Sequence, residues 1–547
     1  MGVASQLMTR ALRTSDLGAI DVGTLMVAPL TLPFHLRRFF SERITMDRAR
    51  RELAHALDTR EQRFLELLAT QVYPCEHSAY RRLLVAADCK LQDVRALIQR
   101  HGLEGTLVQL ARMGVYLSPD EFKGKTDVVR SGVSFRVTPE SVAPLKRSAG
   151  LLSPSSGTSN NPLRSLKQLD WMREETWPTA IFLAAHELEN HAHAGIEPII
   201  PGVAGVAFLI IAARLGIPCE RWFAWQVPIE NSLERLYDNT IAYELALAGS
   251  LFGPGFDRPR SAGDELEEVV HWITKRRKEG KETCVRTVAS NAARVARTAI
   301  RLGASLEGAT FIASGEPITH AKVSTIKQAG ARTVTLYGFE PGVQVAFGCA
   351  APRHIDEMHV NTNTLALVEH PEPVPAATGY VHPLLYTTLY PSASMLLINF
   401  QTGDYATMER GDCGCPMGAA GLDLRIHNIG SFEKLTAEGL AYSFAELAEL
   451  LEGDFPAEFG GGPGDFQLVE HEIDGGRTVL TLLVDPRVGE IEEGHVLSHL
   501  AESLARGSRG NRFMTGVWQE AESLRLERRK PYASARGKVL PIRYLSG

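Results

Sequence analysis

Residues 310–337 read TFIASGEPITHAKVSTIKQAGARTVTLY and hold the clearest α/β unit of the chain. Thr310 to Ala313 and Thr333 to Tyr337 are short runs with the β-branched and aromatic residues that favour strands. Between them, Pro317 suits the first turn of a helix and Gly330 suits its end. A strand, a helix and a second strand joined by short links predict a parallel pair of strands.

The C-terminal part of the chain has a different pattern. Gln467 to Ile473 and Thr478 to Val484 are strand-like runs, and the turn sequence Asp474-Gly475-Gly476-Arg477 joins them. This arrangement predicts a β-hairpin. A helix is expected to follow over Ile491 to Leu504, so this part should form a small α+β unit.

We therefore predict two domains within an α/β fold. Residues 1–428 should form a large N-terminal domain that binds the substrates, with several subdomains, mixed or parallel sheets and flanking helices. Residues 429–547 should form a small, mobile α+β C-terminal lid domain. Near the N-terminus the pattern is helical, because Leu53, Leu57 and Phe64 recur on one helix face.

Three local features are expected between these regions. Val115 to Leu117 is predicted to be a short strand, and so is Met395 to Phe400. Pro178 is predicted to divide a helical stretch into two helices, because proline breaks a helix interior.

Composition excludes several classes of protein. The 547 residues carry a formal net charge of −6, whereas proteins that coat nucleic acid usually have a strongly basic domain. The longest apolar run, Gly202 to Ala213, is shorter than the ~20 residues of a membrane span.

Seven scattered cysteines favour a reducing compartment, and we expect a cytoplasmic protein. Cys413 and Cys415 offer two ligands where a structural zinc ion needs four, so zinc binding stays open.

A cluster of small polar residues has the composition of an anion site. Residues 155–162 read SSGTSNNP, in which small residues let backbone N–H groups converge and hydroxyls add donors. The cluster is not a Walker loop, because no Gly-Lys-Ser/Thr follows. A phosphate-binding loop and an ordinary surface loop are both compatible with this composition.

The cluster gains meaning from other motifs in a fixed order. These are Ser314-Gly315-Glu316-Pro317, Tyr337-Gly338-Phe339-Glu340, Phe400-Gln401-Thr402-Gly403-Asp404 and Arg536-Gly537-Lys538. Together with the cluster they resemble the motifs of adenylate-forming enzymes, the acyl-CoA ligase superfamily, over roughly residues 70–547. Three further segments resemble the phenylacetate–CoA ligase branch: Ser78-Ala79-Tyr80-Arg81-Arg82-Leu83, Gly439-Leu440-Ala441-Tyr442-Ser443-Phe444 and Cys413-Gly414-Cys415.

The resemblance implies roles for particular residues. Those expected to bind ATP are Ser155, Ser156, Gly157, Thr158, Ser159, Gly315, Glu316, Pro317, Tyr337, Gly338 and Asp404. Asp404 would hold the ribose hydroxyls, and the Ser/Thr cluster would hold the β- and γ-phosphates. Lys538 and Glu340 are the expected catalytic residues, with Glu340 as the ligand of Mg²⁺.

The resemblance also implies a reaction. ATP and a carboxylic acid would give an acyl-AMP and pyrophosphate, and the acyl group would then pass to CoA. Glu340 comes one position early, and Ile429-Gly430-Ser431-Phe432-Glu433 replaces the hinge motif and its arginine. Two alternatives therefore stay open. In the first, the acyl group would pass to an amine, another nitrogen nucleophile or a carrier-protein thiol instead of CoA. In the second, the chain would be a non-catalytic member that binds a nucleotide. We expect no nucleic acid among the partners and no membrane span.

Overall fold

The computed structural model describes most of the chain. The described residues are 22–42, 44–130, 132–145, 148–154, 164–197, 203–224, 232–263, 266–339, 343–376, 379–431, 444–473, 477–505, 524–534 and 537–545. Among them, no helix combines the length and the apolar character that crossing a membrane requires.

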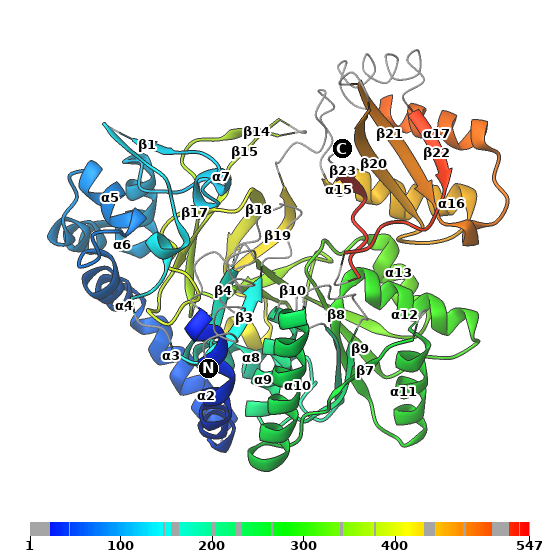
Figure 1. The fold of residues 1–547 in the computed structure, drawn as a ribbon, viewed down its shortest axis with the longest axis horizontal. Helices are drawn as coiled ribbons and strands as arrows, with labels where there is room; N and C mark the ends of the chain where they lie inside the picture. Colours follow the sequence, from blue (N-terminus) through cyan, green and yellow to red (C-terminus); the bar gives the residue numbers. More distant parts are fainter. Residues whose placement is uncertain are drawn as a thin grey trace, which may run out of the picture.

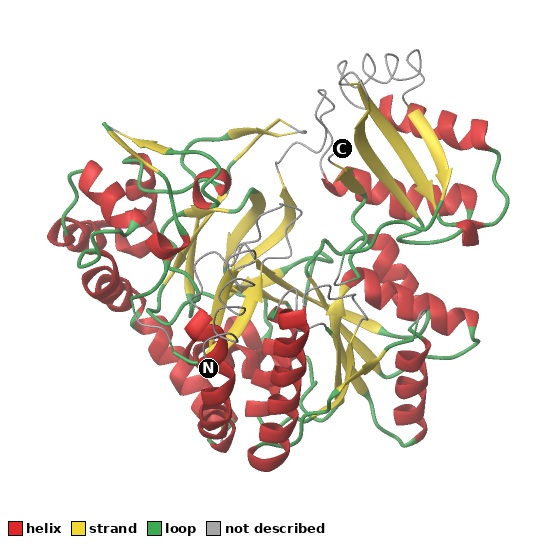
Figure 2. Cartoon of the chain, viewed as in Figure 1, coloured by secondary structure: helices red, strands yellow, loops and turns green. Residues whose placement is uncertain are grey.

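A ten-stranded mixed sheet forms the centre of the body (Figures 1 and 2). Its strands, in spatial order, are β18 (Asp404–Arg410), β19 (Leu424–Ser431), β12 (Met358–Val360), β11 (Val343–Gly348), β10 (Arg332–Phe339), β9 (Ala309–Ser314), β8 (Thr283–Val288), β5 (Ala192–Ile196), β6 (Cys219–Ala224) and β7 (Pro259–Ser261). Neighbours from β10 to β7 are parallel, whereas those from β10 to β18 are antiparallel. The predicted parallel pair is confirmed as β9 and β10, with α13 (His320–Gln328) between them in the chain.

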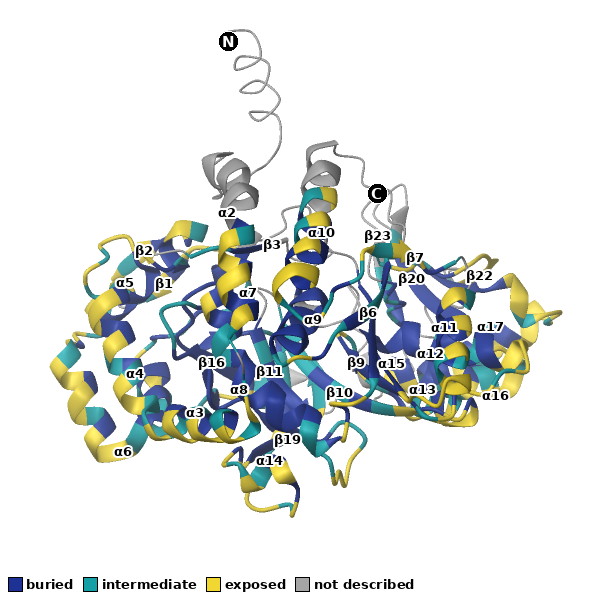
Figure 3. Cartoon of the chain, turned by 90° about the horizontal axis from the view of Figure 1, so that it is seen from below, coloured by how far each residue is buried: buried dark blue, intermediate teal, exposed yellow. Residues whose placement is uncertain are grey.

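Helices cover both faces of the parallel strands. The helices of the body are α2 (Val22–Ser41), α3 (Met46–Asp58), α4 (Arg60–Leu67), α5 (Ala79–Ala86), α6 (Leu91–Arg112), α7 (Pro119–Phe122), α8 (Leu169–Ala185), α9 (Ala204–Arg214), α10 (Ser232–Phe252), α11 (Glu267–Lys278), α12 (Ala289–Arg301), α13 and α14 (Pro416–Ala419), with short turns η1 (Leu68–Val72) and η2 (Pro139–Val142). On β8, Cys284 packs into the core that α8 and α9 share, and Val285 packs into the core of α11 and α12. Figure 3 shows these strands buried between helices whose outer faces are exposed.

Smaller sheets complete the body. One has the order β13-β16-β17, from β13 (Leu365–Glu369), β16 (Leu384–Thr388) and β17 (Phe400–Gln401). Three two-stranded ribbons are β1 (Val128–Arg130) with β2 (Val133–Phe135), β3 (Gly150–Pro154) with β4 (Arg164–Gln168), and β14 (Val374–Ala376) with β15 (Gly379–Val381).

The C-terminal part forms its own sheet and core, at the upper right of Figure 1. Its elements are α15 (Phe444–Glu449), η3 (Leu450–Asp454), α16 (Phe455–Phe459), β20 (Phe466–Ile473), β21 (Arg477–Val484), η4 (Pro486–Val488), α17 (Glu493–Ala505), β22 (Leu524–Arg528) and β23 (Ile542–Leu545). β20 and β21 are antiparallel, which confirms the predicted hairpin, and the sheet order is β22-β21-β20-β23. The expected boundary at residue 429 falls inside β19, and the division into domains stays a prediction.

The prediction that Pro178 divides a helix is wrong. α8 continues through Pro178, although this residue has no N–H to donate to the carbonyl of Glu174, four positions earlier. The side chain of Asn363 donates from Nδ2 to that carbonyl at 2.8 Å. The helix survives because a side chain distant in sequence replaces the missing backbone donor.

The two predicted short strands are also wrong. Near Val115 the chain makes only an isolated bridge, from Leu117 to Phe400. Residues 395–398 are buried but irregular, and only β17 is a strand in this region. Threonine hydroxyls accept from the backbone N–H groups of Leu397 and Asn399, so these groups need no strand partner.

Candidate active site

A cavity of about 590 Å³ lies where the parallel strands β9 and β10 end. The carboxyl ends of parallel strands are the usual place for ligands in α/β sheets. The cavity lining includes residues from three of the sequence motifs: Gly315, Glu316, Pro317, Tyr337, Gly338 and Asp404. The fold thus brings together segments that are up to about ninety residues apart in the chain.

Gly315, which lines the cavity, leaves room for the side chain of Lys538. Its φ of +81° lies in the region that favours glycine. A Cβ added to Gly315 would lie 3.0 Å from Cε and 3.2 Å from Nζ of Lys538. The lysine side chain of the C-terminal segment therefore packs directly on the loop that follows β9.

Glu316 holds this loop in place rather than facing open space. Its Oε1 accepts from the backbone N–H of Ser290 at 2.8 Å, and its Oε2 accepts from the Ser290 hydroxyl at 2.6 Å. Only 2% of its side chain is exposed, and Lys322 lies 3.6 Å away. Ser290 is in the first turn of α12, so Glu316 ties the loop to the start of that helix.

Tyr337 and Asp404 both line the cavity and are joined by a hydrogen bond. The Tyr337 hydroxyl donates to Oδ2 of Asp404 at 2.5 Å, and the hydroxyl of Thr402 donates to the same oxygen at 3.1 Å. Tyr386, on β16, lies 2.9 Å from the Tyr337 hydroxyl. Burial, together with the nearby carboxylate of Asp404, raises the pKa of Tyr337 well above its usual value, so this hydroxyl remains a donor. Asp404 is thereby oriented by two hydroxyl groups.

The backbone around Lys538 is docked onto the body. The N–H of Val539 donates to the Ser290 hydroxyl oxygen at 3.4 Å. Gly537 has a φ of +79°, and a Cβ there would lie 2.4 Å from Oδ1 of Asn291. No larger residue fits at position 537 without displacing Asn291, so the close docking requires glycine.

Buried charges join the C-terminal part to the body. Glu452, in η3, accepts from the Thr319 hydroxyl at 2.6 Å and pairs with Lys322 at 2.7 Å. Asp465 pairs with Arg297 of α12, with one N–O distance of 2.8 Å. These contacts hold the small domain in the arrangement that brings Lys538 to Gly315.

Several predicted residues lie outside the described residues. They are Ser155, Ser156, Gly157, Thr158, Ser159 and Glu340. The cluster at 155–159 belongs to the link between β3 and β4, and Glu340 directly follows β10. Their expected roles, including magnesium binding by Glu340, stay predictions.

Two residues of the site escaped the sequence analysis. Ser290 connects the Glu316 loop with the Lys538 segment, and Tyr386 backs the Tyr337 hydroxyl. Neither belongs to a motif, and both act through partners that are distant in the chain. Ser290 is the second residue of α12 and not its N-cap, which is Val288, so no capping signal in the sequence marks it.

Comparison with solved structures identifies the fold as that of adenylate-forming ligases. The structure of 2-hydroxyisobutyryl-CoA ligase in the postadenylation state, in complex with 2-HIB-AMP, is 13% identical, and the match covers 93% of this chain and 91% of that chain with a TM-score of 0.52. The structure of this ligase in complex with R3-HIB-AMP gives the same identity and coverage with a TM-score of 0.49. No protein-family model and no curated protein matches the sequence. The fold prediction is confirmed, whereas the phenylacetate–CoA ligase branch stays a prediction.

Proposed function

We propose that the chain is an ATP-dependent ligase that adenylates a carboxylic acid. The observation that carries this proposal is the position of Lys538, whose Nζ lies against Gly315 at the edge of the cavity. A lysine side chain is by default a solvated surface charge. Here the side chain packs against Gly315, a residue of the cavity lining in the motif that follows β9.

The cavity suits a nucleotide. Its volume of about 590 Å³ is in the range of roughly 300–1,000 Å³ that is common for small-molecule sites. Apolar side chains such as Ile318, Ile355 and Met358 line it beside polar groups. We assign the ribose hydroxyls to Asp404, because hydrogen bonds to a carboxylate are stronger than those between neutral groups. Gly315, Glu316 and Pro317 would border the adenine, and Tyr337 and Gly338 line the same cavity.

The proposed first step joins two anions. A carboxylate oxygen of the acid attacks the α-phosphorus of ATP, and the bond to the bridging oxygen of pyrophosphate breaks. Lys538 places a positive charge beside the cavity, where it can stabilise negative charge that develops on the oxygens of the reacting groups. Ser155, Ser156, Gly157, Thr158 and Ser159 are the proposed ligands of the β- and γ-phosphates. Glu340 is the proposed ligand of Mg²⁺, which would neutralise phosphate charge.

The proposed second step transfers the acyl group to CoA, with release of AMP. A carrier-protein thiol or an amine would use the same acyl-AMP, and the acceptor decides between them. The non-catalytic alternative predicts nucleotide binding without turnover. It gives no reason for the access that Gly315 and Gly537 provide to the lysine segment.

ATP–pyrophosphate exchange across a panel of carboxylic acids tests the proposal. We expect acid-dependent exchange with at least one class of acid, and CoA should then consume the acyl-AMP and form a thioester. Acyl-AMP that persists with CoA but reacts with an amine or a carrier protein would change the acceptor. A chain that binds ATP but shows no exchange with any acid would support the non-catalytic alternative.

A further inference from the structure

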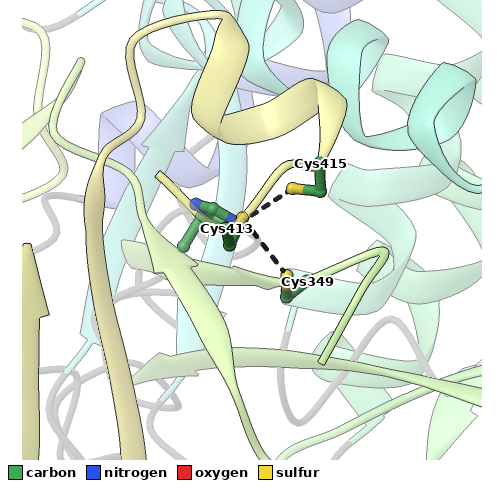
Figure 4. Close-up of side chains that lie close together, drawn as sticks. Cys349, Cys413 and Cys415 are labelled. Atoms are coloured by element: carbon green, nitrogen blue, oxygen red, sulfur yellow. Dashed lines mark hydrogen bonds between the residues drawn. The ribbon is translucent and has the colours of Figure 1, made fainter. Parts of the chain in front are cut away.

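Four potential metal ligands converge beside the antiparallel half of the central sheet (Figure 4). Cys349 directly follows β11, His359 is on β12, and Cys413 and Cys415 lie between β18 and α14. Their ligand atoms all lie within 4.8 Å of one another. The pair Cys413 and Cys415 was visible in the sequence, but the two other members come from segments more than fifty residues away.

The distances between the ligand atoms match a tetrahedral zinc site. Zn–S bonds of about 2.3 Å and Zn–N bonds of about 2.0–2.1 Å place two sulfurs about 3.8 Å apart, and a sulfur and a nitrogen about 3.5 Å apart, on a tetrahedron. The sulfurs of Cys349 and Cys413 are 3.8 Å apart. Nε2 of His359 lies 3.4 Å from the sulfur of Cys413 and 3.1 Å from that of Cys415.

The histidine is oriented for metal binding. Nδ1 of His359 lies 2.5 Å from the backbone carbonyl of Leu422, which can only accept. Nδ1 must therefore carry the proton, and the lone pair is on Nε2, which faces the three sulfurs. This contact is the usual support of a histidine that binds zinc, because it sets both the tautomer and the ring orientation.

The local backbone also positions the sulfur atoms of the cluster. Gly414 has a φ of +76°, so the chain turns sharply between Cys413 and Cys415 and brings both thiols to one side. The N–H of Ala351 donates to the sulfur of Cys349 at 3.4 Å. Cys349, His359 and Cys415 are buried, whereas Cys413 is partly exposed.

A disulfide does not explain the cluster. The separation of 3.8 Å between the Cys349 and Cys413 sulfurs is well above a bonded S–S distance of about 2.05 Å. All seven cysteines of the chain are free thiols in the structure. Apolar packing alone would not direct three sulfurs and an imidazole lone pair to one point.

We propose that Cys349, His359, Cys413 and Cys415 bind a structural zinc ion. Three sulfurs and one nitrogen fill all four positions of a tetrahedral ion, so no position remains for a substrate or a reactive water. The ion would connect the end of β11, the middle of β12 and the segment before α14. It would therefore fasten the antiparallel half of the sheet.

The site lies on the face of β12 opposite the cavity. Met358 lines the cavity, and the next residue along the strand is His359, whose side chain points to the other face. Zinc would thus support the strand without contacting the nucleotide. The proposal is independent of the proposed function, since a non-catalytic chain would bind zinc equally well.

Metal analysis of the untagged, full-length protein tests the proposal directly. We expect one zinc ion per chain by mass spectrometry of the metal content, released when an organomercurial modifies the thiols. Replacement by Co²⁺ should give the visible absorption of tetrahedral cobalt with thiolate ligands. In denaturant with a chelator, seven thiols should react; five would indicate a disulfide and would overturn the proposal. A protein prepared with zinc in the medium that contains no zinc would also overturn it.

Two cysteine variants identify the ligands. Cys413→Ser should weaken zinc binding by more than the roughly 10–100-fold that loss of an outer-shell partner costs. Cys75→Ser makes the same chemical change at another partly exposed thiol and should retain full zinc content. Equal zinc content in both variants would contradict the assignment. If Cys413→Ser does not fold, the metal content and the cobalt spectrum of the wild-type protein still decide.

Discussion

Lys322 offers the strongest test of how the C-terminal part is held on the body. Its Nζ lies 2.7 Å from Glu452 of the small domain and 3.6 Å from Glu316, and no more than 3% of any of these three side chains is exposed. Burial alone would lower the pKa of Lys322, but the two carboxylates outweigh it and raise the pKa, so the ammonium stays charged. Lys322→Met should therefore leave two carboxylates buried without their cation.

Removing one partner of a buried ion pair typically costs about 3–5 kcal/mol, and we expect a loss of this size in the free energy of unfolding. The first transition in urea is the one to follow, because the C-terminal part has its own sheet and core and can unfold separately. Lys327→Met is the matched control, since Lys327 is exposed on the same helix. Lys322→Met combined with Glu452→Met should recover a large part of the loss, because the uncompensated charge of Glu452 is removed too. A single Lys322→Met variant as stable as the Lys327→Met control would refute the reasoning.

Four further outcomes are expected. Lys538→Ala should slow adenylate formation by roughly 10²–10³-fold, while calorimetry shows unchanged ATP binding. The control Lys278→Ala, at an exposed lysine of α11, should change neither quantity. Adenylation by Lys538→Ala at the wild-type rate would remove Lys538 from the mechanism. Asp404→Ala should weaken ATP binding through loss of a charged acceptor, so an unchanged affinity by calorimetry would rule out the ribose assignment. Thr158→Ala should raise the KM for ATP more than the Kd for AMP, and equal effects would contradict phosphate binding. Acidification from pH 7 to pH 5 should remove about 2 kcal/mol of stability through His193 alone, because burial lowers the pKa of His193 to about 4 and the unfolded chain takes up this proton first, near pH 6.5. His193→Asn should reduce this pH dependence in urea unfolding, and an unaltered dependence would show that another group causes it.

The parts of the fold that were predictable are those with local causes. The β9–α13–β10 unit follows from two β-type runs with a proline and a glycine between them, and the hairpin of β20 and β21 follows from its turn sequence. The wrong predictions have distant causes. α8 continues through Pro178, where Asn363 supplies the missing donor, and no local pattern around Pro178 indicates this partner.

The candidate site also has a part that the sequence predicts and a part that depends on contacts between distant segments. Gly315, Tyr337 and Asp404 each belong to a motif at a strand end, and strand ends that share one edge of a sheet meet in one cavity. The contacts of Ser290 with Glu316 and Val539, in contrast, depend on how the small domain docks. The partners of the Cys413 pair could not be chosen from the sequence either, because Cys349 and His359 are brought close by the antiparallel pairing of β11 and β12.

The hydroxyl of Ser290 fixes which groups donate and which accept in the hydrogen bonds that dock the C-terminal segment. A hydroxyl has one proton, and here it goes to Oε2 of Glu316, so the oxygen is left to accept from the N–H of Val539. If position 316 presented a donor toward this oxygen, as the amide of glutamine can, the hydroxyl proton would have to turn elsewhere and would compete with the N–H of Val539 for the same space. The negative charge of Glu316 thus sets the polarity of a hydrogen-bonded chain that ends beside Lys538. The loop after β9 and the C-terminal segment are therefore matched in hydrogen-bond polarity as well as in shape.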